Sequence, residues 1–200
     1  MNLPNRLTLT RIVLTGFFVT ALLLPHLAFG KTMALTIFIV ASLTDWWDGL
    51  LARRHKLETS FGALLDPLAD KILTTAAFIC FIEQDSYKGA PLVQAWMVLV
   101  IVARDFLVTG LRLVAGGQGV VLKAEKLGKH KTISQMITII VTLAGLAARD
   151  DWNCLGFDIA RFNVVFSRVV FGLMLATVAM TVWSGLAYLY KNRDIFLRDA

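Results

Sequence analysis

The chain has 200 residues, of which 57% are hydrophobic and 17% charged, and it carries a formal net charge of +6 at pH 7. A soluble domain is less apolar and about a quarter charged, so this composition indicates a membrane protein. Basic loops beside apolar segments commonly face anionic lipid headgroups, so the positive charge does not predict nucleic-acid binding.

The segment Asn2–Thr8 precedes the first apolar stretch. Its alternation of polar and apolar residues predicts a short interfacial turn or helix at the membrane surface. A simple polar flank on the first membrane helix is the alternative explanation. We expect no cleavable signal, because no small-residue cleavage site follows the N-terminal apolar run.

Six apolar stretches are long enough to be membrane-crossing helices, at about 20 residues for each crossing. In chain order they cover residues 8–29, 33–53, 61–82, 91–115, 132–148 and 165–190. The fifth is short, and we expect its helix to extend back through the basic segment near Lys126. The short connections favour an all-α integral membrane protein whose six transmembrane helices pack as one antiparallel bundle. Residues 1–200 would then form a single domain.

Lysine and arginine are distributed unevenly between the two ends of these expected helices. One end collects most of them, whereas the other carries mainly Lys31, Lys88, Arg149 and Arg161. The more basic end belongs in the cytoplasm by the positive-inside rule. We therefore expect a multi-pass protein of the inner or plasma membrane, with both termini in the cytoplasm.

Four aspartates lie where the second expected helix ends and the third begins. Asp45 and Asp48 are three residues apart, and Asp66 and Asp70 are four apart, so each pair shares one helix face. Two such helices joined by a short loop can bring four carboxylates together near the cytoplasmic end. Intramembrane carboxylates point to a functional site. A cage of oxygen ligands suits Mg²⁺ or Mn²⁺, and a two-metal site of this kind can serve phosphoryl displacement.

Small and basic residues surround these aspartates. Gly49, Ala52 and Gly62 leave room for a bulky phosphate to approach the backbone, and Arg53 is a bidentate phosphate donor. A purely structural alternative is that the carboxylates pair with neighbouring arginines and lysine. Four acids exceed what local structure needs, so phosphate chemistry at a membrane surface is the preferred hypothesis.

The aspartates belong to a pattern with eight fixed positions, D-x2-D-G-x2-A-R-x8-G-x3-D-x3-D, which runs from Asp45 to Asp70. It resembles the signature of the CDP-alcohol phosphotransferase family. The resemblance implies a six-helix membrane bundle, a homodimer, and an enzyme that displaces CMP from a CDP-alcohol. It also implies that Asp45, Asp48 and Asp66 hold metal, while Asp70 contributes to the second metal and acts as the catalytic base.

The same resemblance implies a CDP-binding site formed by the signature and by the N-terminal segment, which is similar to the family's nucleotide-side lid. The residues assigned to this site are Asn5, Thr8, Gly49, Ala52, Arg53, Thr59 and Gly62.

A second polar cluster begins inside the fourth apolar stretch. Arg104 and Asp105 interrupt that stretch, Arg112 follows eight residues later, and Lys129 and Lys131 open the next helix. An arginine inside a membrane span needs a partner, which is either Asp105 or an anionic acceptor. We prefer the second reading, in which the two arginines and two lysines form a pocket for the acceptor's phosphate.

The resemblance to the family, together with this phosphate pocket, implies transfer of the phosphatidyl group from CDP-diacylglycerol to sn-glycerol 3-phosphate. The segments 103–112 and 127–132 also resemble the glycerol-phosphate-specific members of the family. Another acceptor, such as inositol phosphate or serine, stays open within the same chemistry. An intramembrane prenyltransferase would usually need more spans. An ion-coupled transporter would usually show paired halves, and no repeat is visible.

Overall fold

The computed structural model describes residues 3–24, 27–55, 60–86, 89–117, 126–152 and 159–193, with backbone only for 3–8, 45–55, 60–70 and 126–127. Its helices are α1 (Leu3–Leu23), α2 (Gly30–His55), α3 (Ser60–Ile82), α4 (Ala95–Gly117), α5 (Lys126–Leu146) and α6 (Ile159–Lys191). A short π-helix, η1 (Ala147–Asp151), extends α5. Apart from an isolated bridge between Asp85 and Pro91, the regular structure of the described residues is helical, which confirms the all-α prediction.

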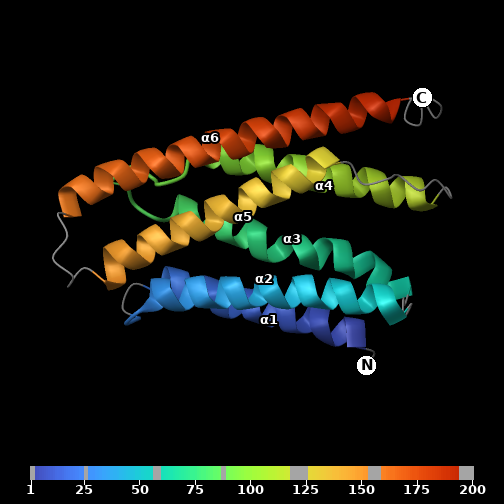
Figure 1. Ribbon diagram of the computed structural model, residues 1–200, viewed down its shortest axis with the longest axis horizontal. Coiled ribbons are helices and arrows are strands. Elements are labelled where there is room, and N and C mark those ends of the chain that lie inside the picture. Colours follow the sequence, from blue (N-terminus) through green and yellow to red (C-terminus); the bar gives the residue numbers. More distant parts are fainter. Residues whose placement is uncertain are drawn as a thin grey trace.

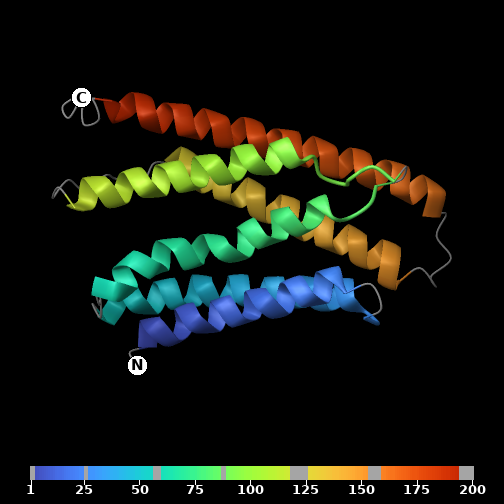
Figure 2. The ribbon, with the colours of Figure 1, turned by 180° about the vertical axis from the view of Figure 1, so that it is seen from behind.

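The helices lie lengthwise beside one another and alternate in direction along the chain (Figures 1 and 2). The start of α1, the end of α2, the start of α3 and the end of α6 lie at one end of the bundle, which we call the aspartate end (Figure 1). The end of α4 and the start of α5 lie there too. Because both α4 and α6 end there, these two helices run in the same direction.

A shared apolar core holds the bundle together. α1 packs against α2 and α3, α5 packs against α6 and α2, and α4 packs against α6 and α3. Phe18 and Phe38, which are fully buried, meet between α1 and α2 with ring centroids 6.0 Å apart. Gly145 of α5 leaves space for the Phe166 ring of α6, because a Cβ at Gly145 would overlap that ring. The two helices can therefore approach closely.

Buried hydroxyl groups also join α5 to α6. The hydroxyl of Thr177 on α6 is hydrogen-bonded to those of Ser134 and Thr138 on α5, at 2.8 and 2.9 Å. Thr138 and Thr177 are both fully buried. Such small polar side chains are common where membrane helices pack, since they allow close approach and supply hydrogen bonds between helices.

Several helix ends differ from the expected spans. α1 is continuous from Leu3, so the N-terminal segment is part of the first helix rather than a separate element. It ends at Leu23 and not near residue 29, just before Pro25, which disfavours helical backbone at the residue before it. α5 begins at Lys126, which confirms the expected extension of the fifth helix.

Two described segments, Gly128–Asp151 and Ile159–Lys191, are long and apolar enough to cross a membrane. Shorter apolar segments occur in α1, α2 and α3, at Leu9–Leu23, Gly30–Thr44 and Lys71–Ile82. This pattern supports a membrane protein. The six crossings, the orientation and the single domain stay predictions.

Hydroxyl groups on the outside of the bundle suit an apolar surrounding. The exposed side chains of Thr20, Thr36 and Thr44 each donate a hydrogen bond to the carbonyl oxygen four residues earlier, at 2.8–2.9 Å. Lipid offers no hydrogen-bond partner for a polar group. A hydrogen bond within the same helix therefore removes the cost of exposing a threonine hydroxyl to lipid.

The end opposite the aspartates is joined by contacts between residues distant in sequence. Asp151 Oδ2 accepts hydrogen bonds from the amide nitrogen and Oγ1 of Thr32, both at 2.7 Å. This carboxylate therefore caps the N-terminus of α2, where negative charge is favourable. Arg149 also donates to the carbonyl oxygen of Asp85 at 2.6 Å. Together these contacts connect η1 to α2 and to the segment between α3 and α4.

Candidate active site

The four signature aspartates belong to two successive helices. Asp45 and Asp48 are in the second half of α2, and Asp66 and Asp70 are in the first half of α3. The end of α2 and the start of α3 meet at the aspartate end (Figure 1). Their backbone placement therefore agrees with the expected arrangement of two acidic helix segments joined by a short loop.

The structure describes the predicted metal and CDP sites at the level of the backbone at most. The side chains of the four aspartates lie outside the described part of the chain, and so do those of Asn5, Thr8, Ala52 and Arg53; Gly49 and Gly62 are described by their backbone only. Thr59 lies outside the described residues altogether. The roles assigned to these residues stay predictions.

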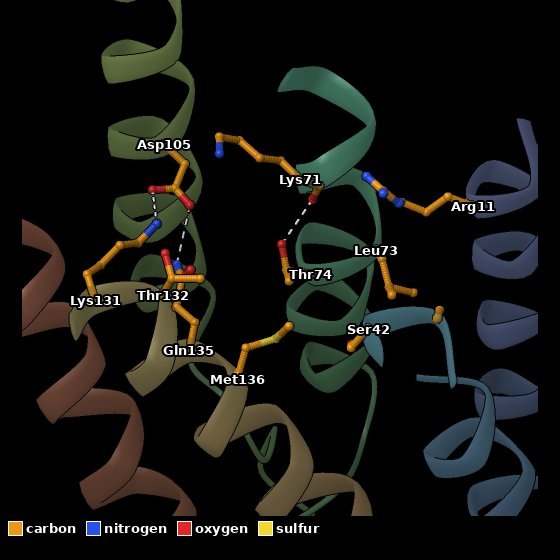
Figure 3. Close-up of a pocket in the computed structure, with 11 residues that line it drawn as sticks. Arg11, Ser42, Lys71, Leu73, Thr74, Asp105, Lys131, Thr132, Gln135 and Met136 are labelled. Carbon is orange, nitrogen blue, oxygen red and sulfur yellow. Dashed lines mark hydrogen bonds and ion pairs between the residues drawn. The ribbon is translucent and has the colours of Figure 1, made fainter. Parts of the chain in front are cut away.

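A polar cavity of about 110 Å³ lies next to these helix segments (Figure 3). Its lining residues are Arg11, Ala41, Ser42, Lys71, Leu73, Thr74, Asp105, Lys131, Thr132, Gln135 and Met136. Ser42 precedes Asp45 by three residues and Lys71 directly follows Asp70. The cavity therefore adjoins the helix turns that carry the signature.

The lining of this cavity holds charged groups of both signs. Arg11, Lys71 and Lys131 are cations and Asp105 is an anion. Figure 3 shows Lys131 in contact with Asp105 on one side, with Arg11 extending from α1 on the other. Arginine and lysine side chains are the groups that commonly bind phosphate in proteins.

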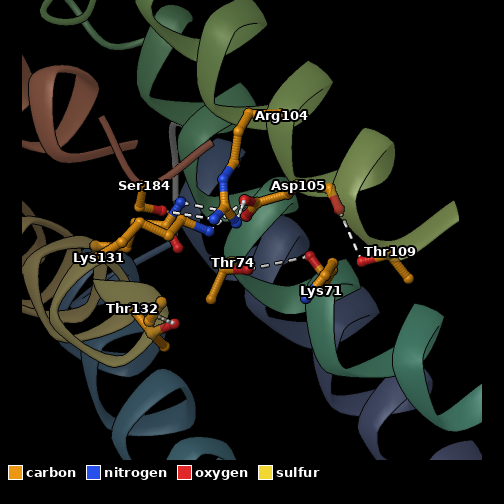
Figure 4. Close-up of polar contacts among 10 residues, drawn as sticks. Lys71, Thr74, Arg104, Asp105, Thr109, Lys131, Thr132 and Ser184 are labelled. Carbon is orange, nitrogen blue, oxygen red and sulfur yellow. Dashed lines mark hydrogen bonds and ion pairs between the residues drawn. The ribbon is translucent and has the colours of Figure 1, made fainter. Parts of the chain in front are cut away.

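Asp105 is the centre of the polar contacts between α4 and α5 (Figure 4). Its Oδ1 forms an ion pair with Lys131 Nζ and lies 3.4 Å from Arg104 Nη1. Its Oδ2 accepts a hydrogen bond from Gln135 Nε2 at 3.3 Å. The Lys131 and Asp105 side chains are only 5% and 9% exposed. The structure thus contains the alternative in which Asp105 is the partner of the arginine.

Arg104 also reaches from α4 to α6. Its Nη2 donates a hydrogen bond to Ser184 Oγ at 2.5 Å (Figure 4). Its aliphatic part passes α6 at Gly185, where an added Cβ would lie 3.0 Å from Arg104 Cγ. The Nε of Arg104 is buried without a hydrogen-bond partner among the described residues. The last helix therefore takes part in the polar cluster.

The other two members of the predicted acceptor pocket lie apart from Asp105. Arg112 is exposed, two turns further along α4, and its guanidinium carbon lies 5.4 Å from the centre of the Tyr188 ring. This is a cation–π contact. Lys129 is exposed on the first turn of α5. The structure therefore brings Arg104 and Lys131 together, while Arg112 and Lys129 lie closer to the aspartate end of their helices.

The residues of this region that were not predicted as site residues include two cations and one serine. Lys71 and Arg11 line the cavity, and Ser184 contacts Arg104. The position of Lys71 directly after Asp70 was a usable signal, as was the rarity of a charge such as Arg11 inside an apolar helix. No comparable signal in the sequence marks Ser184, because its role depends on how α6 packs.

Comparison with known proteins places these features in a family. The model of CDP-alcohol phosphatidyltransferase matches residues 1–186. A relative from Bacillus subtilis is 40% identical over 202 residues, covering 96% of this chain and 95% of the relative. Relatives from Sodalis glossinidius and Yersinia enterocolitica are 33% and 35% identical, covering 98% and 94% of this chain and 98% and 93% of their own length. All three are named CDP-diacylglycerol–glycerol-3-phosphate 3-phosphatidyltransferase.

Proposed function

The chain belongs to the CDP-alcohol phosphatidyltransferase family, and on that basis we propose that it transfers the phosphatidyl group of CDP-diacylglycerol to sn-glycerol 3-phosphate. The products are phosphatidylglycerol phosphate and CMP. The names of the three relatives state this pair of substrates. The structural observation that supports the choice of acceptor is the cluster of Lys131, Arg104 and Asp105, whose Lys131 lines the cavity beside the aspartate-bearing turns.

The aspartates fit a divalent metal by the chemistry of their donor set. Carboxylate oxygens are the ligands that Mg²⁺ and Mn²⁺ prefer, and all four residues belong to two helix segments at one end of the bundle. Asp45, Asp48 and Asp66 would hold the metal, with Asp70 contributing to a second. When bound, the metal would offset the charge of the donor's pyrophosphate oxygens and of the departing CMP.

Side chains of the protein accept the proton of the acceptor's hydroxyl and stabilise the charge of the leaving group. Asp70 accepts the proton of the acceptor's 1-hydroxyl, and the hydroxyl oxygen forms a bond to the β-phosphorus of CDP-diacylglycerol. The bond between that phosphorus and the bridging oxygen of the pyrophosphate breaks, and CMP leaves. Arg53 stabilises the negative charge on CMP as it departs.

The basic residues would hold the acceptor's phosphate during this step. Lys131 and Arg104 meet at Asp105, and Lys131 lines the cavity that adjoins the acidic helix turns. Asp105 keeps both cations in place. Arg112 and Lys129 would meet the phosphate from the aspartate end. Fixing the acceptor in this way aligns its hydroxyl for attack.

The remaining proposals concern the setting of the enzyme. All six helices would cross the membrane, with the aspartate end in the cytoplasm, in a single-domain homodimer. The unequal distribution of lysine and arginine supports this orientation. Accessibility of single cysteines to a membrane-impermeant reagent from each side tests the orientation, and light scattering of the detergent-solubilised protein tests the dimer.

An acceptor panel tests the function directly. Purified protein receives CDP-diacylglycerol and Mg²⁺ or Mn²⁺, together with sn-glycerol 3-phosphate, serine, inositol phosphate or no acceptor, and released CMP is measured. We expect release to depend on sn-glycerol 3-phosphate. Preference for serine or inositol phosphate would replace the acceptor, and no release with any of them would contradict the enzyme class.

A further inference from the structure

We infer that α6 positions the two arginines of α4 that bind the acceptor's phosphate, through Ser184, Gly185 and Tyr188. This inference rests on the proposed function and extends it to a helix that has no part of the signature. It makes these three residues positioning residues, which act on the acceptor only through Arg104 and Arg112.

The first support is the way α6 receives Arg104. Ser184 Oγ accepts a hydrogen bond from Nη2 at 2.5 Å, and the Arg104 side chain is only 16% exposed. Gly185 leaves the space through which the side chain passes, since an added Cβ would come within 3.0 Å of Arg104 Cγ. Cγ is close to the backbone of Arg104. If it moves away from an added Cβ, the guanidinium group at the end of the side chain moves with it. A glycine at 185 therefore determines where that group lies.

The second support is the contact between Tyr188 and Arg112. The guanidinium lies over the ring at 5.4 Å from its centre, and the tyrosine is only 2% exposed, so the ring is held by its surroundings. The Tyr188 hydroxyl is buried without a hydrogen-bond partner among the described residues. The aromatic face, rather than the hydroxyl, is therefore the group that fixes the exposed arginine.

The two contacts lie on one face of α6. Ser184, Gly185 and Tyr188 are all buried, and the four steps from residue 184 to residue 188 correspond to about 6 Å of helix. Arg104 and Arg112 are eight residues apart, or about 12 Å along α4, which runs in the same direction (Figure 1). The two long side chains thus converge from α4 onto a single turn of α6. One face of α6 therefore contacts both arginines.

Advance positioning has a clear benefit for binding. An arginine side chain has many rotamers, and ordering it when the ligand arrives weakens affinity. Holding both guanidinium groups beforehand removes most of that cost. The effect should therefore appear in the KM for the phosphate-bearing acceptor and not in the chemical step.

The test compares purified variants in steady-state CMP release, with each substrate varied in turn. Ser184→Ala, Gly185→Ala and Tyr188→Leu should each raise the KM for sn-glycerol 3-phosphate by about threefold to tenfold, with kcat and the KM for CDP-diacylglycerol within about twofold of the parent. Tyr188→Phe keeps the ring and should raise the KM for sn-glycerol 3-phosphate less than Tyr188→Leu does. Gly172→Ala is the matched control, because a Cβ at this exposed glycine of α6 meets nothing within 4 Å.

Each outcome bears on the inference. An unchanged KM for sn-glycerol 3-phosphate in the three variants overturns it, as does an equal rise for both substrates, which would indicate a packing role alone. If Gly185→Ala does not fold, Ser184→Ala carries the test, because it removes only one oxygen. A parent enzyme that releases no CMP with sn-glycerol 3-phosphate contradicts the proposed function, and the inference falls with it. Activity in the parent with unaffected variants overturns the inference alone.

Discussion

Replacing Lys131 by methionine separates its two possible roles, as counter-ion of Asp105 and as ligand of the acceptor's phosphate. The variant leaves the Asp105 carboxylate, which is 9% exposed, without the closer of its two ion-pair partners. Removing one member of a buried pair typically costs about 3–5 kcal/mol of stability. Arg104 and Gln135 stay within 3.4 and 3.3 Å of the carboxylate, so we expect a loss near the lower limit, about 3 kcal/mol.

The double variant Lys131→Met with Asp105→Leu removes both charges together. Replacing a buried pair by apolar side chains of similar size is often neutral or stabilising, but Arg104 also loses its carboxylate partner, so stability should return only part of the way to that of the parent. The KM for sn-glycerol 3-phosphate should stay high, because the phosphate still lacks its cation. A charged hydrogen bond contributes about 1.5–3 kcal/mol, which corresponds to roughly a tenfold to hundredfold rise in KM.

The assay pairs chemical unfolding in detergent, followed by tryptophan fluorescence, with steady-state CMP release. Arg168→Met, which removes a cation from an exposed position on α6, is the control for the loss of one positive charge. Recovery of a normal KM in the double variant would show that Lys131 serves only Asp105, and it would refute the phosphate role. An unchanged stability in Lys131→Met would refute the reasoning on the buried pair.

Four more outcomes are expected. Asp45→Asn and Asp66→Asn should each abolish CMP release while circular dichroism stays that of the parent, and turnover in excess chelator would contradict the metal role. Asp70→Asn should lower kcat by about 10²–10⁴-fold with little change in the KM for CDP-diacylglycerol, whereas a near-normal kcat would leave this residue as a ligand only. Arg112→Ala should raise the KM for sn-glycerol 3-phosphate about tenfold, and Arg112→Lys should recover only part of it, because an ammonium cannot reproduce the bidentate fork. Thr177→Val removes the hydroxyl that joins α6 to Ser134 and Thr138 and should lower the unfolding free energy by about 0.6–2 kcal/mol in detergent, so an unshifted transition would speak against it.

The helices themselves could be predicted from the sequence, but several of their ends could not. Hydropathy measures transfer into lipid, and a helix does not have to stop where its residues become polar. α6 accordingly begins at Ile159 and includes Arg161 and Asn163, although the apolar stretch begins at 165. α1 likewise includes the polar residues at its start, from Leu3 onward.

Part of the candidate site could likewise be predicted from the sequence, and part of it could not. The aspartates were identifiable because their spacing along two adjacent segments is a local property. The partner of Arg104 was not, since both an ion pair with Asp105 and an anionic ligand satisfy a charge inside an apolar helix. Ser184 lies 80 residues from Arg104, and small uncharged residues such as serine and glycine are common in membrane helices, so their contact with Arg104 depends on packing alone.

The cap on α2 has a consequence for the making of the protein. Thr32 and the carboxylate that caps it are 119 residues apart, so α2 leaves the ribosome long before Asp151 exists. At roughly 5–20 residues per second, the delay is about 6–24 s. Throughout that interval the first amide groups of α2 must be satisfied by water or lipid headgroups. The contact between η1 and α2 is therefore a late step of assembly, completed only after the fifth helix has been synthesised.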